Sequence, residues 1–383
     1  GDDLMKRTTQ GFSHLLLTLT LLLSMVGCSG KEPPQANRSD AAPTALTIAD
    51  LKEILSALDA SNSTLTYCNG ENEETHPANA AIRTKKYIKE LQDYDVWETC
   101  QPPENWNPSG EYYYKFHGDG ISLISYQNGF TGLQPFHVTT DTGDGWFRLS
   151  DIPAEQDNSA QQFGWMVYDT FGKWYSEART ADLYRSTSPP LTADELDELE
   201  AYTACQVSTY IEEWGGYTVS PTPISCFFTS LYDDPRDMDA NTFITYCPSL
   251  KVLDSDDEDE FRLVQKKINF RATDGHLLTL EEMPTPCHRL PRSYINDILM
   301  QYAGITIEDM HSDWKSNLCY IPETDCFYTF TSDFGPGAFN PSYGEKSGAI
   351  VTLWGASSCN EGPAVLTLQK NGNGWLIRSF QAI

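Results

Sequence analysis

The residues best suited to chemistry form three short motifs near the carboxyl end of the chain. Ser312 and Lys315 stand three residues apart, and this spacing puts a hydroxyl and an amine one turn from each other on a helix. In that arrangement the lysine can accept the serine proton and make the serine a nucleophile. The tripeptides Ser332-Asp333-Phe334 and Lys346-Ser347-Gly348 follow in the same part of the chain.

Together these motifs are similar to the Ser-x-x-Lys, Ser-Asp-Asn and Lys-Ser/Thr-Gly motifs of serine β-lactamases and penicillin-binding proteins. The second motif departs from the pattern, because Phe334 stands where the Asn belongs. The close spacing also leaves no room for the helical domain that separates the motifs in those enzymes. We therefore treat the match as coincidental and assign no catalytic residue. An extracytoplasmic hydrolase or peptidoglycan-active enzyme with an unrecognised site remains an alternative.

Cofactor and metal motifs do not emerge from the sequence. The chain contains no C-x-x-C, no H-E-x-x-H, no G-x-S-x-G and no phosphate-binding glycine loop. The acidic segment 254–260 and the segment 141–145 offer hard oxygen ligands of the kind that Ca²⁺ prefers. The first lacks the glycine and glutamate spacing of an EF-hand and suits a helix start, and the second suits a hairpin turn. The prediction is therefore no metal and no cofactor.

The net charge and the aromatic residues indicate which classes of partner this protein can bind. The chain has 54 acidic and 26 basic residues, a formal charge of −28, which repels nucleic acid. Aromatic residues make up 12% of the chain, and several of them lie in segments that read as β-hairpins. If they share one exposed face they can stack on sugars or grip a peptide, and otherwise they fill the core under the sheet. These candidate ligand-binding aromatics are Trp146, Trp165, Tyr168, Trp174 and Tyr175.

The spacing of apolar residues, helix caps and turn residues predicts an α+β protein with two domains. Residues 46–188 begin with a capped helix at Thr47 and continue as a meander of hairpins, with turns expected at 117–120, 143–145 and 169–172. The run Arg185–Pro190 is the expected boundary. Residues 189–383 then show capped helices, the first of which is expected to start at Thr192 with Glu195 in a capping-box spacing. An antiparallel sheet with a turn at 371–374 follows, a layout similar by analogy to cystatin-like folds.

Two packing expectations follow from this layout. We expect the strands 325–332, 348–354, 364–370 and 374–380 to form one sheet, covered by the helix 293–303. Leu376 and Phe380 are the expected inward positions on the last strand. In the first domain, Cys68 and Cys100 are the only two cysteines, so they form the only disulfide possible within it.

The amino-terminal segment has the pattern of an export signal. We expect translation to start at Met5, which Lys6 and Arg7 follow as a basic region before the apolar run 15–23. That run is short for a helix that spans a bilayer. Residues 29–45 are rich in Ser, Pro and Ala and predict a flexible linker.

The segment 25–28 resembles the lipobox of bacterial lipoproteins, with Met25 in place of the usual Leu. The resemblance implies cleavage before Cys28, lipidation of its thiol with acyl chains such as palmitate, and a cell-membrane anchor on the extracytoplasmic face. The phrases at 230–235, 302–310 and 323–328 are similar to those in uncharacterised lipoproteins of Gram-positive gut bacteria. The leading hypothesis is a surface lipoprotein that binds an extracellular glycan, peptide or envelope protein, and a purely structural envelope role is a further alternative.

Overall fold

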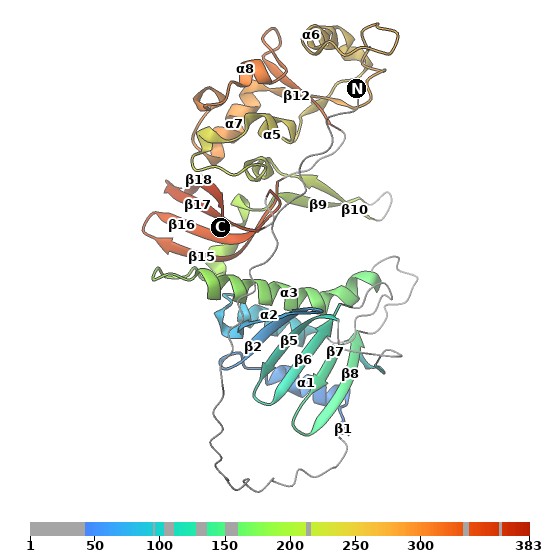
Figure 1. The fold of residues 1–383 in the computed structure, drawn as a ribbon, viewed down its shortest axis with the longest axis vertical. Helices are drawn as coiled ribbons and strands as arrows, with labels where there is room; N and C mark the ends of the chain where they lie inside the picture. The colour runs from blue at the N-terminus through green and yellow to red at the C-terminus, as the bar shows by residue number, and fades with distance from the viewer. Residues whose placement is uncertain are drawn as a thin grey trace, which may run out of the picture. The chain divides into compact units, whose positions relative to one another are not determined.

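The computed structural model describes residues 43–94, 96–102, 111–127, 136–149, 160–211, 216–331, 337–359 and 362–383, with the side chains of 160–166, 210–211 and 216–217 excepted. Helices and antiparallel sheets both contribute to this part of the chain, which is therefore α+β, as predicted (Figure 1). Pro43–Ile383 forms one compact unit. None of its described helices combines the length and apolarity needed to cross a bilayer.

The first half of this unit is built on one sheet with the strand order β1-β8-β7-β6-β5-β2-β3, and β4 pairs with β8. The predicted capped helix is confirmed, since Thr47 and Asp50 form a reciprocal capping box at the start of α1. The turn at Asp119 and Gly120 is confirmed as well, because both residues have positive φ between β5 and β6. The strands are β1 (Thr44–Ala45), β2 (Thr64–Asn69), β3 (Glu73–Pro77), β4 (Trp97–Thr99), β5 (Tyr112–Gly118), β6 (Ile121–Tyr126), β7 (Phe136–Thr139) and β8 (Gly143–Leu149). The helices are α1 (Ile48–Ser56), η1 (Ala78–Ala80), α2 (Thr84–Asp93) and α3 (Ala160–Tyr184).

The predicted hairpin around 169–172 is wrong, because this segment belongs to α3. Phe171, Trp174, Ala178 and Ala181 are fully buried at helical spacing, and α3 lies against the sheet through this face (Figure 1). Gly172 does not form a turn; it stands where the ring of Tyr114 approaches the helix.

The turn predicted at 143–145 is also misplaced, because these residues lie inside β8. A Cβ added to Gly143 or Gly145 would meet the side chain of Leu46 within 3 Å. The glycines are therefore explained by this close approach of Leu46. The turn itself precedes them and is held by Thr140, whose hydroxyl accepts from the amide of Gly143 at 2.9 Å.

Three further sheets make up the second half: β9 with β10, the order β11-β12-β14-β13, and the order β15-β16-β17-β18. Thr192 and Glu195 cap α4 as predicted, and the turn between Asn371 and Gly374 joins β17 to β18. The strands are β9 (Gln206–Ile211), β10 (Gly216–Pro221), β11 (Lys251–Val252), β12 (Cys287–Pro291), β13 (Tyr320–Ile321), β14 (Cys326–Phe330), β15 (Phe339–Ser347), β16 (Ile350–Ser357), β17 (Pro363–Asn371) and β18 (Gly374–Ala382). The helices are α4 (Ala193–Glu198), η2 (Glu200–Tyr202), η3 (Pro223–Phe228), η4 (Pro235–Asp237), α5 (Ala240–Thr245), η5 (Ser255–Asp257), α6 (Glu258–Ile268), α7 (Arg292–Tyr302), η6 (Ile307–Asp309) and α8 (Trp314–Asn317).

The expected single sheet after residue 318 is wrong, because β14 belongs to a different sheet from β15–β18. Helix α7 contacts both sheets, through β12 and through β18. Ile295, Ile298 and Leu299 on this helix share one buried cluster with Phe327 of β14 and Phe380 of β18. The helix thus covers both sheets.

The buried side chains form clusters that largely correspond to the two halves of the unit. One cluster draws on residues 51–181 together with Tyr343, and another on residues 191–380. Contacts also join the halves: Ser186 donates its amide to Glu345 at 2.6 Å, and Ser176 and Ser342 share a hydrogen bond at 3.1 Å.

Candidate functional site

The predicted ligand-binding aromatics do not form one exposed face. Trp174 is fully buried, and Tyr168 and Tyr175 are less than a tenth exposed. The Trp174 indole donates to the carbonyl of Ala78 at 3.0 Å and lies among other rings of the core. The side chain of Trp165 lies outside the described residues. These positions support the core interpretation for the aromatics on α3.

Trp146 is the one predicted aromatic on a strand. It lies half-buried on β8, with its ring stacked on His137 at 4.2 Å and 8° and on Tyr126 at 5.8 Å and 17°. His137 in turn bonds to Asp144 at 2.5 Å. Trp146 is therefore part of a stacked ladder across β6, β7 and β8.

The predicted disulfide between Cys68 and Cys100 does not form, and both residues are free thiols. Cys68 lies on β2, whereas the amide of Cys100 bonds to the carbonyl of Trp146 on β8. Three strands separate β2 from β8 in the sheet, which places them about 19 Å apart at ~4.8 Å per strand. A disulfide needs Cα atoms within about 7 Å.

The nucleophile motifs are not assembled into one site by the described residues. Ser312 precedes α8, and its buried hydroxyl has no hydrogen-bond partner among the residues the structure describes. Lys315 instead lies over the ring of Trp314, with its Nζ 5.2 Å from the ring centroid. Lys346 is on β15, where it lies 3.5 Å from Glu195, and residues 332–334 lie outside the described residues.

Neither acidic segment gathers into a metal site. Within the described ranges, no group of three or more His, Cys, Asp or Glu side chains is arranged to hold a metal ion. Asp257 is instead paired with Lys251 at 2.5 Å, and Asp254 caps the turn that leads into α6.

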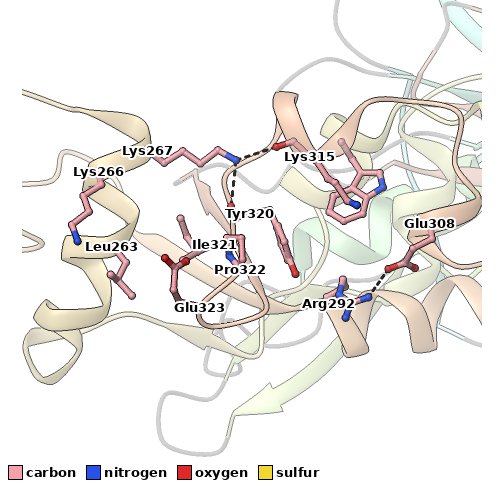
Figure 2. Close-up of a pocket in the computed structure, with 11 residues that line it drawn as sticks. Leu263, Lys266, Lys267, Arg292, Glu308, Lys315, Tyr320, Ile321, Pro322 and Glu323 are labelled. Carbon is pink, nitrogen blue, oxygen red and sulfur yellow. Dashed lines mark hydrogen bonds and ion pairs between the residues drawn. The ribbon is translucent and has the colours of Figure 1, made fainter.

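The most chemically distinctive cavity lies among α6, α7, α8 and the segment around β13, and it has a volume of about 610 Å³ (Figure 2). Such a volume suits a small molecule, since binding pockets commonly measure about 300–1,000 Å³. We call it the lysine cavity. Four basic side chains line it: Lys266, Lys267, Arg292 and Lys315.

Lys267 fixes one wall of the lysine cavity. Its ammonium donates to the backbone carbonyls of Lys315 at 3.1 Å and of Tyr320 at 3.3 Å, so that it holds α8 and β13 to the end of α6 (Figure 2). Lys266 and Lys315 are exposed and form no ion pair with a described residue. These two ammonium groups are therefore available to a ligand.

Arg292 and Glu308 neutralise each other at the opposite side. Arg292 donates to Glu308 at 2.5 Å and to Asp325 at 2.7 Å. Burial would raise the pKa of the Glu308 carboxyl, but hydrogen bonds from Arg292 and Asn296 lower it overall. The hydrogen bonds that Arg292 donates to Asp325 and to Glu308, with the bond to Asp325 first, raise the pKa of Arg292. This pair remains ionised and serves to shape the wall.

Apolar and aromatic groups complete the lysine cavity. Trp314 and Tyr320 meet edge to face at 5.3 Å, and Tyr320 donates its hydroxyl to Asp325 at 2.6 Å. Leu263 and Ile321 add aliphatic surface. Glu323 and Glu308 are the two acidic side chains of the lining, so the lining has a formal excess of two positive charges. The arrangement can attract an anion and cover its apolar part.

Sequence reasoning singled out Lys315 for a different reason and missed Lys266, Lys267 and Arg292. The only local signal was the Lys266-Lys267 pair in a strongly acidic chain. Basic residues in the last turn of a helix are also favoured by the helix dipole, so this signal did not distinguish a site from a helix end.

Comparisons of the chain with protein-family models, with curated proteins and with solved structures give no match.

Proposed function

We propose that this protein is a membrane-anchored extracytoplasmic lipoprotein that binds a small anionic ligand in the lysine cavity. The observation that carries the proposal is the local excess of positive charge in that cavity, within a chain whose formal charge is −28. Lys266 and Lys315, whose ammonium groups form no ion pair with a described residue, supply the attraction. An ammonium group without a neighbouring carboxylate in so acidic a chain is suited to bind an anionic ligand.

The ligand class that best fits is an acidic sugar. A uronate offers a carboxylate to the lysines and a ring with apolar faces to the half-buried ring of Tyr320, which the buried Trp314 supports from behind. Glycans were among the expected extracellular partners, together with peptides and envelope proteins. Arg292 and Asn296 hold Glu308 ionised, so this carboxyl group is not suited to donate a proton to a substrate.

The experiment is isothermal titration calorimetry with glucuronate and, as the uncharged comparison, glucose. Glucuronate should bind more tightly, and the double variant K266Q/K315Q should lose about threefold to tenfold in affinity, as expected for exposed charges. The matched control is K370Q: Lys370 lies over the ring of Trp375 at 4.7 Å, as Lys315 does over Trp314, but it does not line the cavity. Equal binding of glucose, or no effect of the double substitution, would contradict the proposal.

The anchor is proposed on the resemblance of residues 25–28 to a lipobox, which lies outside the described residues. Cleavage before Cys28 and acylation of its thiol would hold the protein at the outer face of the cell membrane, and residues 29–45 would act as the tether. A structural envelope role would need neither anion binding nor the lysine cavity.

For the layout we propose the finer division into 46–188 and 189–383, with the second part as helices on an antiparallel sheet of cystatin-like arrangement. The division is supported by the separate buried clusters of the two halves. Limited proteolysis near Arg185–Pro190 tests it, because two separately folded products would be recovered if each part folds alone.

A further inference from the structure

A second cavity, of about 950 Å³, lies between the start of α2 and the segment that leads into α4. Half-buried and buried aliphatic side chains line one part of it: Leu58, Ile82, Ile88 and Leu191. Ile82 contacts both of the buried clusters that belong to the two halves. This seam groove is therefore an apolar opening where two cores meet, a common place for ligand sites.

Cations gather beside the apolar lining. Arg83, Lys85, Lys86 and Arg185 line the seam groove, against Asp59 as the one carboxylate in its lining. Arg83 is occupied, since it bonds to Glu177 and Asp197, neither of which lines the groove. Lys85 and Lys86 are exposed on consecutive positions of α2 and form no ion pair with the residues described. The groove thus offers free positive charge next to aliphatic surface.

We propose that the seam groove binds an alkyl carboxylate, with its chain along Leu58, Ile82 and Ile88 and its carboxylate at Lys85 and Lys86. Charge complementarity favours an anion, because Lys85 and Lys86 form no ion pair with a described residue and Asp59 is the single acidic residue of the lining. The aliphatic lining distinguishes this groove from the lysine cavity, where Trp314 and Tyr320 form the wall. This inference does not depend on the function proposed for the lysine cavity.

The test is calorimetric titration of the full chain with octanoate and decanoate below their micelle-forming concentrations, with 1-decanol and acetate as comparisons. Each methylene buried in the groove should strengthen binding about fourfold, so decanoate should bind up to about 15-fold more tightly than octanoate. The double variant K85Q/K86Q should weaken decanoate binding about threefold to tenfold, as expected for exposed charges.

Lys89 supplies a matched control, because it lies one turn further along α2, is paired with Asp93 at 2.9 Å and does not line the groove. K89Q should bind decanoate like the wild type, and so should K266Q/K315Q in the lysine cavity. The proposal is overturned if decanoate does not bind, if 1-decanol binds equally well, or if acetate matches decanoate. It is also overturned if K85Q/K86Q binds like K89Q, or if K266Q/K315Q abolishes the binding.

Discussion

Arg83 should contribute more to stability than any exposed ion pair of the protein. Its guanidinium donates to Glu177 on α3 at 2.6 Å and also to Asp197 on α4, and its backbone amide donates to Glu177 at 3.1 Å. The side chain of Glu177 is only 4% exposed. Substituting Arg83 with Ala would leave this carboxylate buried without its counter-charge.

The expected cost is about 3 kcal/mol in the free energy of unfolding. Removing one partner of a buried ion pair typically costs about 3–5 kcal/mol, and the lower value applies because Arg83 is 15% exposed, so that water can replace part of its bonds. The matched control is K89A on α2, the helix that begins directly after Arg83. Lys89 and Asp93 form an exposed pair, for which about 0.3–0.5 kcal/mol is expected.

Urea unfolding followed by tryptophan fluorescence measures both losses. The double variant R83A/E177Q tests whether the unpaired carboxylate causes the loss, because a neutral amide at residue 177 no longer needs a counter-charge. This double variant should therefore be more stable than R83A alone. The reasoning is refuted if R83A loses no more stability than K89A, or if E177Q does not restore part of the loss in the R83A background.

Three further outcomes are expected. Burial would raise the pKa of Glu345, but hydrogen bonds from Ser186 and Tyr343 lower it overall. A lowered folded-state pKa gives stability that is present above the unfolded value of about 4.5 and is lost as the pH falls through the folded value. The difference in unfolding free energy between wild type and E345Q should therefore narrow from pH 6 to pH 3. A difference that stays constant over this range would contradict the stabilising role of the ionised Glu345. C28A should move the protein from the membrane to the soluble fraction in a carbonate-washed fractionation, and retention on the membrane would reject the lipid anchor. W174A should lose about 3–5 kcal/mol in urea unfolding, since the side chain is fully buried, and a loss below 1 kcal/mol would contradict its place in the core.

Helix α3 shows why the sequence pattern around residues 165–175 predicted a hairpin where the protein forms a helix. The aromatic pairs around 165–168 and 173–175 have the composition of strands, and Gly172 reads as a turn. The buried residues Phe171, Trp174, Ala178 and Ala181 follow a helical period that becomes visible only over a longer window. The local composition favours strands, but the packing of the buried face of this segment against the sheet stabilises the helix. The capped starts at Thr47 and Thr192 could be predicted because a capping box is a local device.

The last strand shows a limit of strict alternation. Leu376 and Phe380 are the expected inward pair and both are buried, but the neighbouring Ile377 is fully buried as well. A register shift between Thr367 and Leu368 lies opposite this position, and an extra residue changes which side chains point inward. Nothing in the sequence around 374–380 marks the shift.

Neither cavity could have been predicted from a motif, because each is assembled from segments far apart in the chain. Lys266 and Lys315 are separated by β12, α7 and η6, and Lys86 and Leu191 by β4 to β8 and α3. Short motifs reveal sites built on one turn or one loop. Here the surface charge is informative only after the fold has placed these lysines beside apolar walls.

The total charge also limits what the lysines can bind. A formal charge of −28 repels any large polyanion that must cover much of the surface, and nucleic acid is the extreme case. A small anion experiences a different field, since the Debye length is about 8 Å at physiological ionic strength. Charges beyond that distance are largely screened, so an anion close to Lys266 and Lys315 interacts mainly with the cavity lining, where positive charge is in excess. The acidic surface therefore does not oppose the proposed ligands, and it favours small anions over extended ones.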